Sequence, residues 1–221
     1  MKVSIVIFTL NEITGMKAIM PRIKREWYDE MIIVDGGSTD GTIEYARAQG
    51  YTIFNQKEKG IPAAIIEGMQ KSAGDVIVLF TPDGNSIPER IPDLVKKMKE
   101  GYDIVIVSRY LDGAKSYDDD VITSFGNKVL TGLINLLFRA GITDAVVIFR
   151  AFRKEVVRSL GCEKKAIAWP TKLLLRAVKR NLRVGEIPGD EPRRIGGVRK
   201  LRPLRDGMCE LTMILKEFFI R

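Results

Sequence analysis

The chain has 221 residues, enough for one large domain, and its 45% hydrophobic and 29% charged residues are typical of a folded protein rather than a disordered one. Its net charge of +8 suggests an acidic partner, such as nucleic acid, anionic lipid or a phosphorylated small molecule, unless it only confers solubility. The absence of histidine excludes Ser-His-Asp triads, Cys-His pairs and histidine metal sites, so acid–base chemistry must fall to carboxylates, lysine, tyrosine or the substrate.

Short apolar runs alternate with helical patterns in the first half of the chain. The runs are almost continuously apolar, as are strands that are buried on both faces of a parallel sheet. They predict strands at residues 3–8, 31–34, 51–54, 76–80 and 104–107. Helices are predicted over residues 62–73 and from a capping box at Ser86-Ile87-Pro88-Glu89 to Lys99. The alternation predicts an α/β fold with a mainly parallel sheet.

The second half predicts a helix, a strand, a helix, a strand, a loop rich in Pro, Gly and Arg, and a last helix. In that order the ranges are 123–138, 148–153, 172–179, 182–187, 188–205 and 207–219. The first of these helices is apolar and is interpreted as a core helix, with a membrane surface as the alternative. The last is amphipathic, which leaves three partners open for its apolar side: the core, a second copy in a homodimer, or a membrane surface. We expect one domain over residues 1–221, since no repeat or linker divides it.

Polar residues follow the first two predicted strands, at the strand ends where open α/β sheets bind ligands. Thr9, Asn11 and Glu12 can contact a base or a ribose, although Asn11 can instead cap the next helix. In the second segment, residues 35–42, Asp35 can accept hydrogen bonds from a base or sugar, and the glycines let the backbone approach a ligand. A tight strand-to-helix turn is the alternative there.

A lone carboxylate follows the fourth predicted strand, in Thr81-Pro82-Asp83-Gly84-Asn85. Magnesium often takes one or two protein carboxylates and completes its shell with substrate phosphates, so Asp83 is a candidate ligand for Mg²⁺ or Mn²⁺. The alternative, compatible with the first, is that Asp83 stabilises the turn and Ser86 caps the following helix.

These segments, in this order, resemble the family 2 glycosyltransferases. The opening through Glu12 resembles the family's V-x-I-P-x-x-N-E, and residues 35–42 match V-D-(D/G)-G-S-T-D-G-T. Further matches are Val107-Ser108-Arg109-Tyr110 to G-S-R-Y, Thr143-Asp144 with residues 149–153 to T-D-P-x-S-G-F-R-A-F-R, and residues 193–204 to a basic R-x-G-G-x-S-K-L. The later matches point to the branch around dolichol- and polyprenyl-phosphate hexose synthases. The resemblance covers nearly the whole chain.

The resemblance implies the GT-A fold, with a Rossmann-like half that binds the nucleotide sugar (residues 1–110) and an acceptor-side half (111–221) that ends in the amphipathic helix. It implies a UDP- or GDP-sugar donor and Mg²⁺ or Mn²⁺ as cofactor. Matched residue by residue, the implied roles are nucleotide binding by Thr9, Asn11, Glu12, Asp35 and Ser38, metal binding by Asp83 and Asn85, catalysis by Asp83 and Arg109, and diphosphate or acceptor binding by Ser124, Arg150, Arg194 and Lys200.

Thr81 departs from the family's D-x-D, whose first aspartate it replaces. The implied function is inverting transfer of a sugar to a polyprenyl-phosphate, glycan or cell-envelope acceptor. The alternative is a nucleotide-sugar-binding protein of the same fold with little activity. A hydroxyl acceptor needs a general base, and no matching carboxylate supplies one, which favours an already ionised phosphate acceptor. The aspartates at 118–120 are interpreted as a solvated loop, with a base or a second metal contact as the alternative.

Cys162 and Cys209 are far apart and in no CxxC pattern, so we expect free thiols in a reducing compartment. The apolar run at residues 3–10 is too short for a signal peptide, and no uncharged apolar run approaches the ~20 residues that span a bilayer. A cytoplasmic protein is expected, with peripheral attachment to the membrane left open. Nucleic acid is not an expected partner, because no binding motif accompanies the Arg-rich segment.

Overall fold

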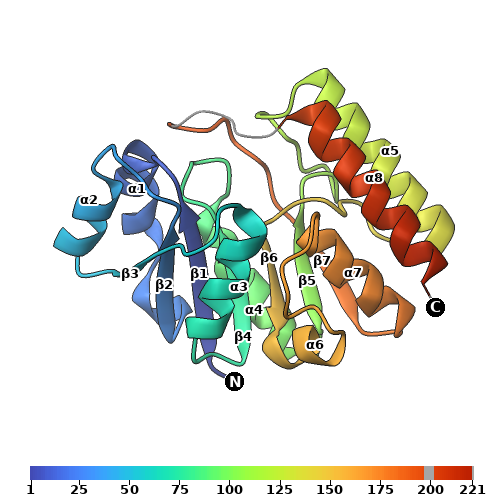
Figure 1. Ribbon diagram of the computed structural model, residues 1–221, viewed down its shortest axis with the longest axis horizontal. Coiled ribbons are helices and arrows are strands. Elements are labelled where there is room, and N and C mark those ends of the chain that lie inside the picture. The colour runs from blue at the N-terminus through green and yellow to red at the C-terminus, as the bar shows by residue number, and fades with distance from the viewer. Residues whose placement is uncertain (197–201, 221) are drawn as a thin grey trace.

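The computed structural model describes residues 1–196 and 202–220, and within them seven strands form one sheet (Figure 1). Neighbouring strands are parallel except where β6 is involved, and the order is β3-β2-β1-β4-β6-β5-β7. The strands are β1 Val3–Thr9, β2 Glu30–Asp35, β3 Thr52–Asn55, β4 Val76–Phe80, β5 Ile104–Ser108, β6 Arg150–Arg153 and β7 Val184–Pro188. The mainly parallel sheet is thus confirmed, and each of the first five strands lies within one residue of its predicted bounds.

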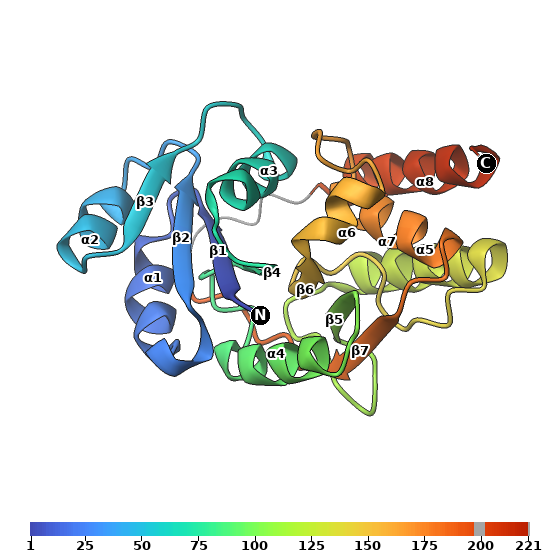
Figure 2. The ribbon, with the colours of Figure 1, turned by 90° about the horizontal axis from the view of Figure 1, so that it is seen from below.

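Helices cover both faces of the sheet (Figure 2). Successive strand residues point to opposite faces, so Val6 packs in the core cluster that contains α3 and α7, whereas Ile5 packs in the cluster that contains α1 and α4. The helices are α1 Ile13–Ile19, α2 Thr42–Ala48, α3 Ile61–Lys71, α4 Ile91–Lys99, α5 Val121–Phe138, α6 Lys154–Ser159, α7 Trp169–Lys179 and α8 Pro203–Phe219.

Two predicted helix starts were wrong. The capping box at Ser86 does not form: a 3₁₀ turn, Pro88–Arg90, precedes α4, and the Ser86 hydroxyl donates to Asn85 Oδ1 at 3.4 Å. The last helix begins at Pro203, inside the predicted loop, because a proline suits the first helical turn, where its missing N–H costs no hydrogen bond.

The helix α5 is not the core helix that its apolar sequence suggested. It lies beside α8, with Phe138 edge-on to Phe218 at a ring distance of 6.0 Å (Figure 1). Its buried residues are Thr123, Thr131 and Ile134, whereas Val121 is 86% exposed. By length and composition alone, α5 is the one helix within the described residues that could cross a membrane. The two helices pack against each other and against α7, and only three residues of each are buried.

Candidate functional site

The carboxyl ends of β1 and β2 carry a loop that is organised around Asp35. This carboxylate is fully buried. Its Oδ1 accepts hydrogen bonds from the amides of Gly37 and Ser38 at 2.8 and 2.7 Å, and its Oδ2 accepts from the hydroxyls of Thr9 and Ser38 at 2.8 and 2.5 Å. The prediction that Asp35 accepts bonds from a base or sugar stays a prediction. In this structure its four bonds fix the backbone of the loop that faces the sheet edge.

Asn11 joins this loop to the end of β1. Its φ of 57° is left-handed, a conformation that asparagine tolerates, and its Oδ1 accepts from the Thr39 amide at 2.8 Å. It does not cap α1, which was the alternative reading. Asp40 takes that position, since its carboxylate accepts from the first amides of both α1 and α2 at 3.0 Å each. Glu12 is buried beside them, and its amide donates to Thr42 Oγ1 at 3.0 Å.

Asp83 lies after β4, at the same edge of the sheet. Its Oδ1 accepts weakly from the Thr81 hydroxyl at 3.2 Å and from the Asn85 amide at 3.3 Å. Burial raises the pKa of Asp83 above its usual value, against the opposing effect of Arg194. The residue that replaces the first aspartate of D-x-D therefore acts as a hydrogen-bond donor to the second.

The loop after β7 folds over Asp83. The Ile195 amide donates to the Asp83 carbonyl at 2.8 Å, and the Ile195 side chain lies so close to Gly84 that a Cβ there would stand 2.5 Å from it. Arg194 Nη2 lies 3.6 Å from Asp83 Oδ2. Of the two cations predicted in this basic loop, Arg194 is thus beside the candidate metal carboxylate, and Lys200 lies outside the described residues.

A divalent cation fits the residues after β4 by their chemistry. Asp83 and the side-chain oxygen of Asn85 are the hard oxygen donors that Mg²⁺ and Mn²⁺ take, and substrate phosphates commonly complete such a shell. The guanidinium of Arg194 already places a positive charge against Asp83. No group of three or more acidic, His or Cys side chains that could hold a metal alone exists among residues 1–196 and 202–220.

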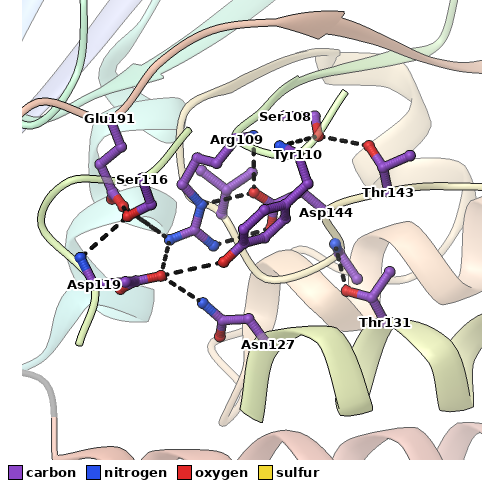
Figure 3. Close-up of polar contacts among 12 residues, drawn as sticks. Ser108, Arg109, Tyr110, Ser116, Asp119, Asn127, Thr131, Thr143, Asp144 and Glu191 are labelled. Atoms are coloured by element: carbon purple, nitrogen blue, oxygen red, sulfur yellow. Dashed lines mark hydrogen bonds and ion pairs between the residues drawn. The ribbon is translucent and has the colours of Figure 1, made fainter. Parts of the chain in front are cut away.

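Arg109, at the end of β5, is the centre of a second polar cluster (Figure 3). Its guanidinium binds Asp144 through two bonds, Nε–Oδ2 at 2.7 Å and Nη2–Oδ1 at 3.0 Å. Its Nη1 lies 3.1 Å from Asp119 and 3.2 Å from Glu191. Burial opposes the charged form of Arg109, but these carboxylates outweigh it and raise the pKa of the guanidinium. Arg109 is therefore bound by three protein carboxylates in this structure, and its predicted role as a cation for the leaving diphosphate stays a prediction.

The aspartates at 118–120 are not a solvated loop, as predicted. Asp118 accepts from the Arg194 amide at 3.1 Å, and Asp120 caps α5 by accepting from the Thr123 amide at 2.7 Å. Asp119 Oδ2 accepts from Tyr110 and Asn127 at 3.3 and 3.0 Å, in addition to Arg109 (Figure 3). The three aspartates therefore connect α5 to the loop after β5 and to the loop after β7. Their charge pattern alone did not indicate these connections.

Ser124 lies in the first turn of α5, where it is half-buried beside the Tyr110 phenol. Burial raises the pKa of that phenol, and hydrogen bonds from Asn127 and Ser124 oppose the rise. Ser124 is thus close to the Arg109 cluster, on the acceptor-side half. The ammonium of Lys128 lies 5.6 Å from the centre of the Tyr110 ring.

Arg150 lies in the core, and its predicted role in diphosphate or acceptor binding stays a prediction. It is fully buried in β6 and donates to the main-chain carbonyls of Ala145, Val147 and Pro170. Burial lowers the pKa of Arg150 to about 10. The arginine belongs to the F-R-A-F-R match, and its function here is to satisfy carbonyl groups in the core.

Four acidic residues of the two clusters were not predicted site residues: Asp118, Asp119, Asp144 and Glu191. A signal existed for Asp144, which stands in the matched Thr143-Asp144 pair, and for Asp118, which was considered as a metal contact. Glu191 lies in a loop without regular periodicity, so only the fold shows that it reaches Arg109.

Comparison with known proteins agrees with the arrangement of these segments. Residues 4–161 match the model of the family described as "Glycosyl transferase family 2". A dolichol-phosphate mannosyltransferase of Pyrococcus furiosus is 34% identical over 212 residues, which are 91% of this chain and 60% of that protein. Glycosyltransferase AglJ of Haloferax volcanii is 25% identical over 90% of this chain and 66% of its own length. The chain therefore spans less than two thirds of either relative.

The fold is also that of solved glycosyltransferase structures. Glucosyl-3-phosphoglycerate synthase from Mycobacterium tuberculosis, in complex with Mn²⁺, UDP-glucose and phosphoglyceric acid, superposes with a TM-score of 0.74 at 21% identity, covering 100% of this chain and 80% of that one. Another structure of that enzyme contains Mg²⁺ and UDP. At this identity the likeness establishes the fold, which is the expected GT-A fold.

Proposed function

The chain belongs to glycosyl transferase family 2, and from this premise we propose that it transfers a sugar, with inversion, from a nucleoside-diphosphate sugar to a polyprenyl-phosphate or glycan acceptor. The observation that carries the proposal is the meeting of two segments at one sheet edge. The loop fixed by Asp35 follows β2, the carboxylate of Asp83 follows β4, and both of these strands are neighbours of β1. Arg194 reaches Asp83 from the acceptor-side half.

Residues 1–110 form the donor side in this proposal. Thr9, Asn11 and Ser38 are tied into one loop by Asp35 and Thr39, so the nucleotide meets a prearranged surface rather than Asp35 itself. Both UDP- and GDP-sugars are compatible with this loop. Preorganisation of this kind lowers the ordering cost of binding.

Charge on the leaving diphosphate is met by Arg194 in this proposal, rather than by Arg109. Arg109 is shared by three carboxylates, whereas Arg194 is on the loop that covers Asp83. A bound Mg²⁺ or Mn²⁺ would supply Lewis-acid stabilisation of the departing diphosphate. Asp83 and Asn85 would hold it, and the fixed cation and the metal together oppose the charge that develops in the transition state.

A lipid-linked phosphate is the acceptor that the α5–α8 pair favours. Apolar side chains that project outward from these helices include Val121, Phe125, Leu136, Met208 and Phe219. Basic residues are interspersed with them, such as Lys128 and Lys216. Exposed apolar surface edged by lysines suits the interface of an anionic membrane. A phosphate acceptor also needs no general base, in keeping with the absence of histidine.

The test is release of nucleoside diphosphate from UDP- and GDP-sugars by the full chain, with Mn²⁺, in the presence of a short polyprenyl phosphate, a glycan acceptor or neither. Transfer to the polyprenyl phosphate is expected, with product of inverted anomeric configuration by NMR. If the chain binds nucleotide sugars but turns none over with any acceptor, the weakly active binding protein is the correct function.

A further inference from the structure

Thr81 leaves the β4 loop with a single carboxylate. In the family pattern an aspartate stands at this position, but the Thr81 hydroxyl here only donates to Asp83 Oδ1 at 3.2 Å. A divalent cation held by one carboxylate and one amide relies heavily on substrate phosphates. The site would therefore gain most from a second carboxylate that comes from another loop.

Two further loops converge on Asp83 and bring such a carboxylate with them. The loop before α5 pairs with the loop after β7, because the Tyr117 amide donates to the Glu191 carbonyl at 2.8 Å and the Glu191 amide to the Lys115 carbonyl at 2.9 Å. The Arg194 amide then donates to Asp118 Oδ1 at 3.1 Å. Main-chain bonds therefore fix Asp118 to the same loop whose Ile195 amide binds the Asp83 carbonyl.

Asp83 and Asp118 share one cation. Nη2 of Arg194 lies 3.6 Å from Asp83 Oδ2 and 3.3 Å from Asp118 Oδ2, and both carboxylate side chains are mostly buried. Among residues 1–196 and 202–220, these two desolvated carboxylates face one guanidinium, which leaves an excess negative charge that is unfavourable away from water. The fold thus holds the carboxylates of Asp83 and Asp118 on either side of one positively charged group, the Arg194 guanidinium.

We infer that Asp118 is the second protein carboxylate of the divalent-cation site, in the role of the aspartate that Thr81 replaces. The inference rests on the proposed function and adds to it a ligand from a loop outside D-x-D. A divalent cation bound by both carboxylates compensates the charge that one guanidinium leaves. Arg194 is the resident partner of these carboxylates in the metal-free chain and competes with the metal for them.

Calorimetric titration of Mn²⁺ into the full chain, with and without saturating UDP, tests the inference. Asp118→Asn is expected to weaken Mn²⁺ binding by about tenfold or more, on the scale of lost metal-site contacts. Asp112→Asn is the matched control: it removes the same charge from the same connection, is exposed, and its left-handed φ of 48° suits asparagine. It should leave Mn²⁺ binding unchanged. Thermal unfolding without metal checks that each variant is folded.

A second experiment introduces an aspartate at position 81. Thr81→Asp in the Asp118→Asn background should recover Mn²⁺ affinity, which a merely structural Asp118–Arg194 ion pair would not do. Wild-type Mn²⁺ affinity in Asp118→Asn, failure of Thr81→Asp to restore it, or the absence of Mn²⁺ binding by the wild type would each overturn the inference. Asp118-dependent Mn²⁺ binding without sugar transfer would instead contradict the proposed function and leave the metal ligand standing.

Discussion

Arg109 and Asp144 form a two-pronged ion pair in the interior, with Nε–Oδ2 at 2.7 Å and Nη2–Oδ1 at 3.0 Å. Asp144 is fully buried and comes from the segment before β6, whereas Arg109 ends β5. The pair therefore attaches an irregular segment to the sheet, and Asp119 and Glu191 extend the attachment to the loops on either side.

Replacement of Arg109 by methionine should destabilise the fold by about 3–5 kcal/mol, because it leaves buried carboxylates without their cation. The double variant Arg109→Met/Asp144→Leu should lose less stability than Arg109→Met alone. Urea unfolding measures both. Arg22→Met, which breaks the exposed Arg22–Glu89 pair, is the control and should lose less than ~1 kcal/mol. Equal losses in Arg109→Met and Arg22→Met would contradict a central role for the cluster.

Asp83→Asn should stabilise the metal-free protein while it abolishes Mn²⁺ binding. Burial raises the folded-state pKa of Asp83 above its ordinary value, so the folded chain binds more protons than the unfolded chain between those two values. Stability therefore falls as the pH rises through that window, and the variant should lack this dependence. At pH 7 we therefore expect the melting temperature of the variant to rise. Asp112→Asn, at an exposed site, is the control; a lower melting temperature for Asp83→Asn would refute the prediction.

Arg150→Met should cost about 3 kcal/mol or more of stability, since it removes the donor from several buried carbonyls. The folded variant should bind UDP as the wild type does, because Arg150 lies in the core rather than at the sheet edge. Urea unfolding and UDP calorimetry separate the two effects. Arg158→Met, at an exposed position on α6, should change neither; selective loss of UDP affinity in Arg150→Met would restore the predicted diphosphate role.

Asp35→Asn should weaken UDP or GDP binding by about tenfold, although Asp35 is itself buried. An amide at this position cannot accept from two amides and two hydroxyls at once, so Ser38 and Thr9 lose their fixed positions. Calorimetry of the nucleotide measures the loss. Glu44→Gln, on α2 beyond this loop, is the control. An unchanged nucleotide affinity would show that the loop is organised without the Asp35 charge.

Substitution of Phe125 and Leu136 by glutamate should reduce binding of the chain to vesicles that contain phosphatidylglycerol, on the order of tenfold or more. Each side chain is exposed on α5, and burying an apolar side chain of this size in the interface contributes ~1.5–3 kcal/mol. Vesicle flotation measures the change. Ile61→Glu, which introduces the same charge on α3, should bind as the wild type does. No flotation by the wild type would remove the support that α5 and α8 give to a lipid-linked acceptor.

The strands were predictable because strands that are buried on both faces are almost wholly apolar, and this pattern does not depend on the partner. β6 lies within the strand predicted at residues 148–153, but its place between β4 and β5 and its antiparallel direction were not predictable, since they depend on tertiary contacts. The polar residues that follow the strands were located correctly because the ends of the strands were.

Residue roles were less predictable than residue positions. Asp35 and Arg150 were expected to contact ligands, and the structure adds hydrogen bonds of each to protein groups that the sequence match did not indicate, because a match does not show which way a side chain points. The exposure of α5 also escaped prediction. The sequence of an apolar helix has the same pattern whether the helix packs on the core or on a partner outside the chain.

The short strand β6 has a consequence for how the chain folds. It is the strand that joins β4 to β5, so β5 and β7 cannot be attached to the donor-side strands before residues 150–153 exist. Strands β1–β4 can pair as soon as they are synthesised, whereas β5 must wait for a segment more than forty residues further along. The two halves between which the proposed active site lies are thus joined only through a late strand in the middle of the sheet, and β7, which is synthesised later still, is added at the outer side of β5.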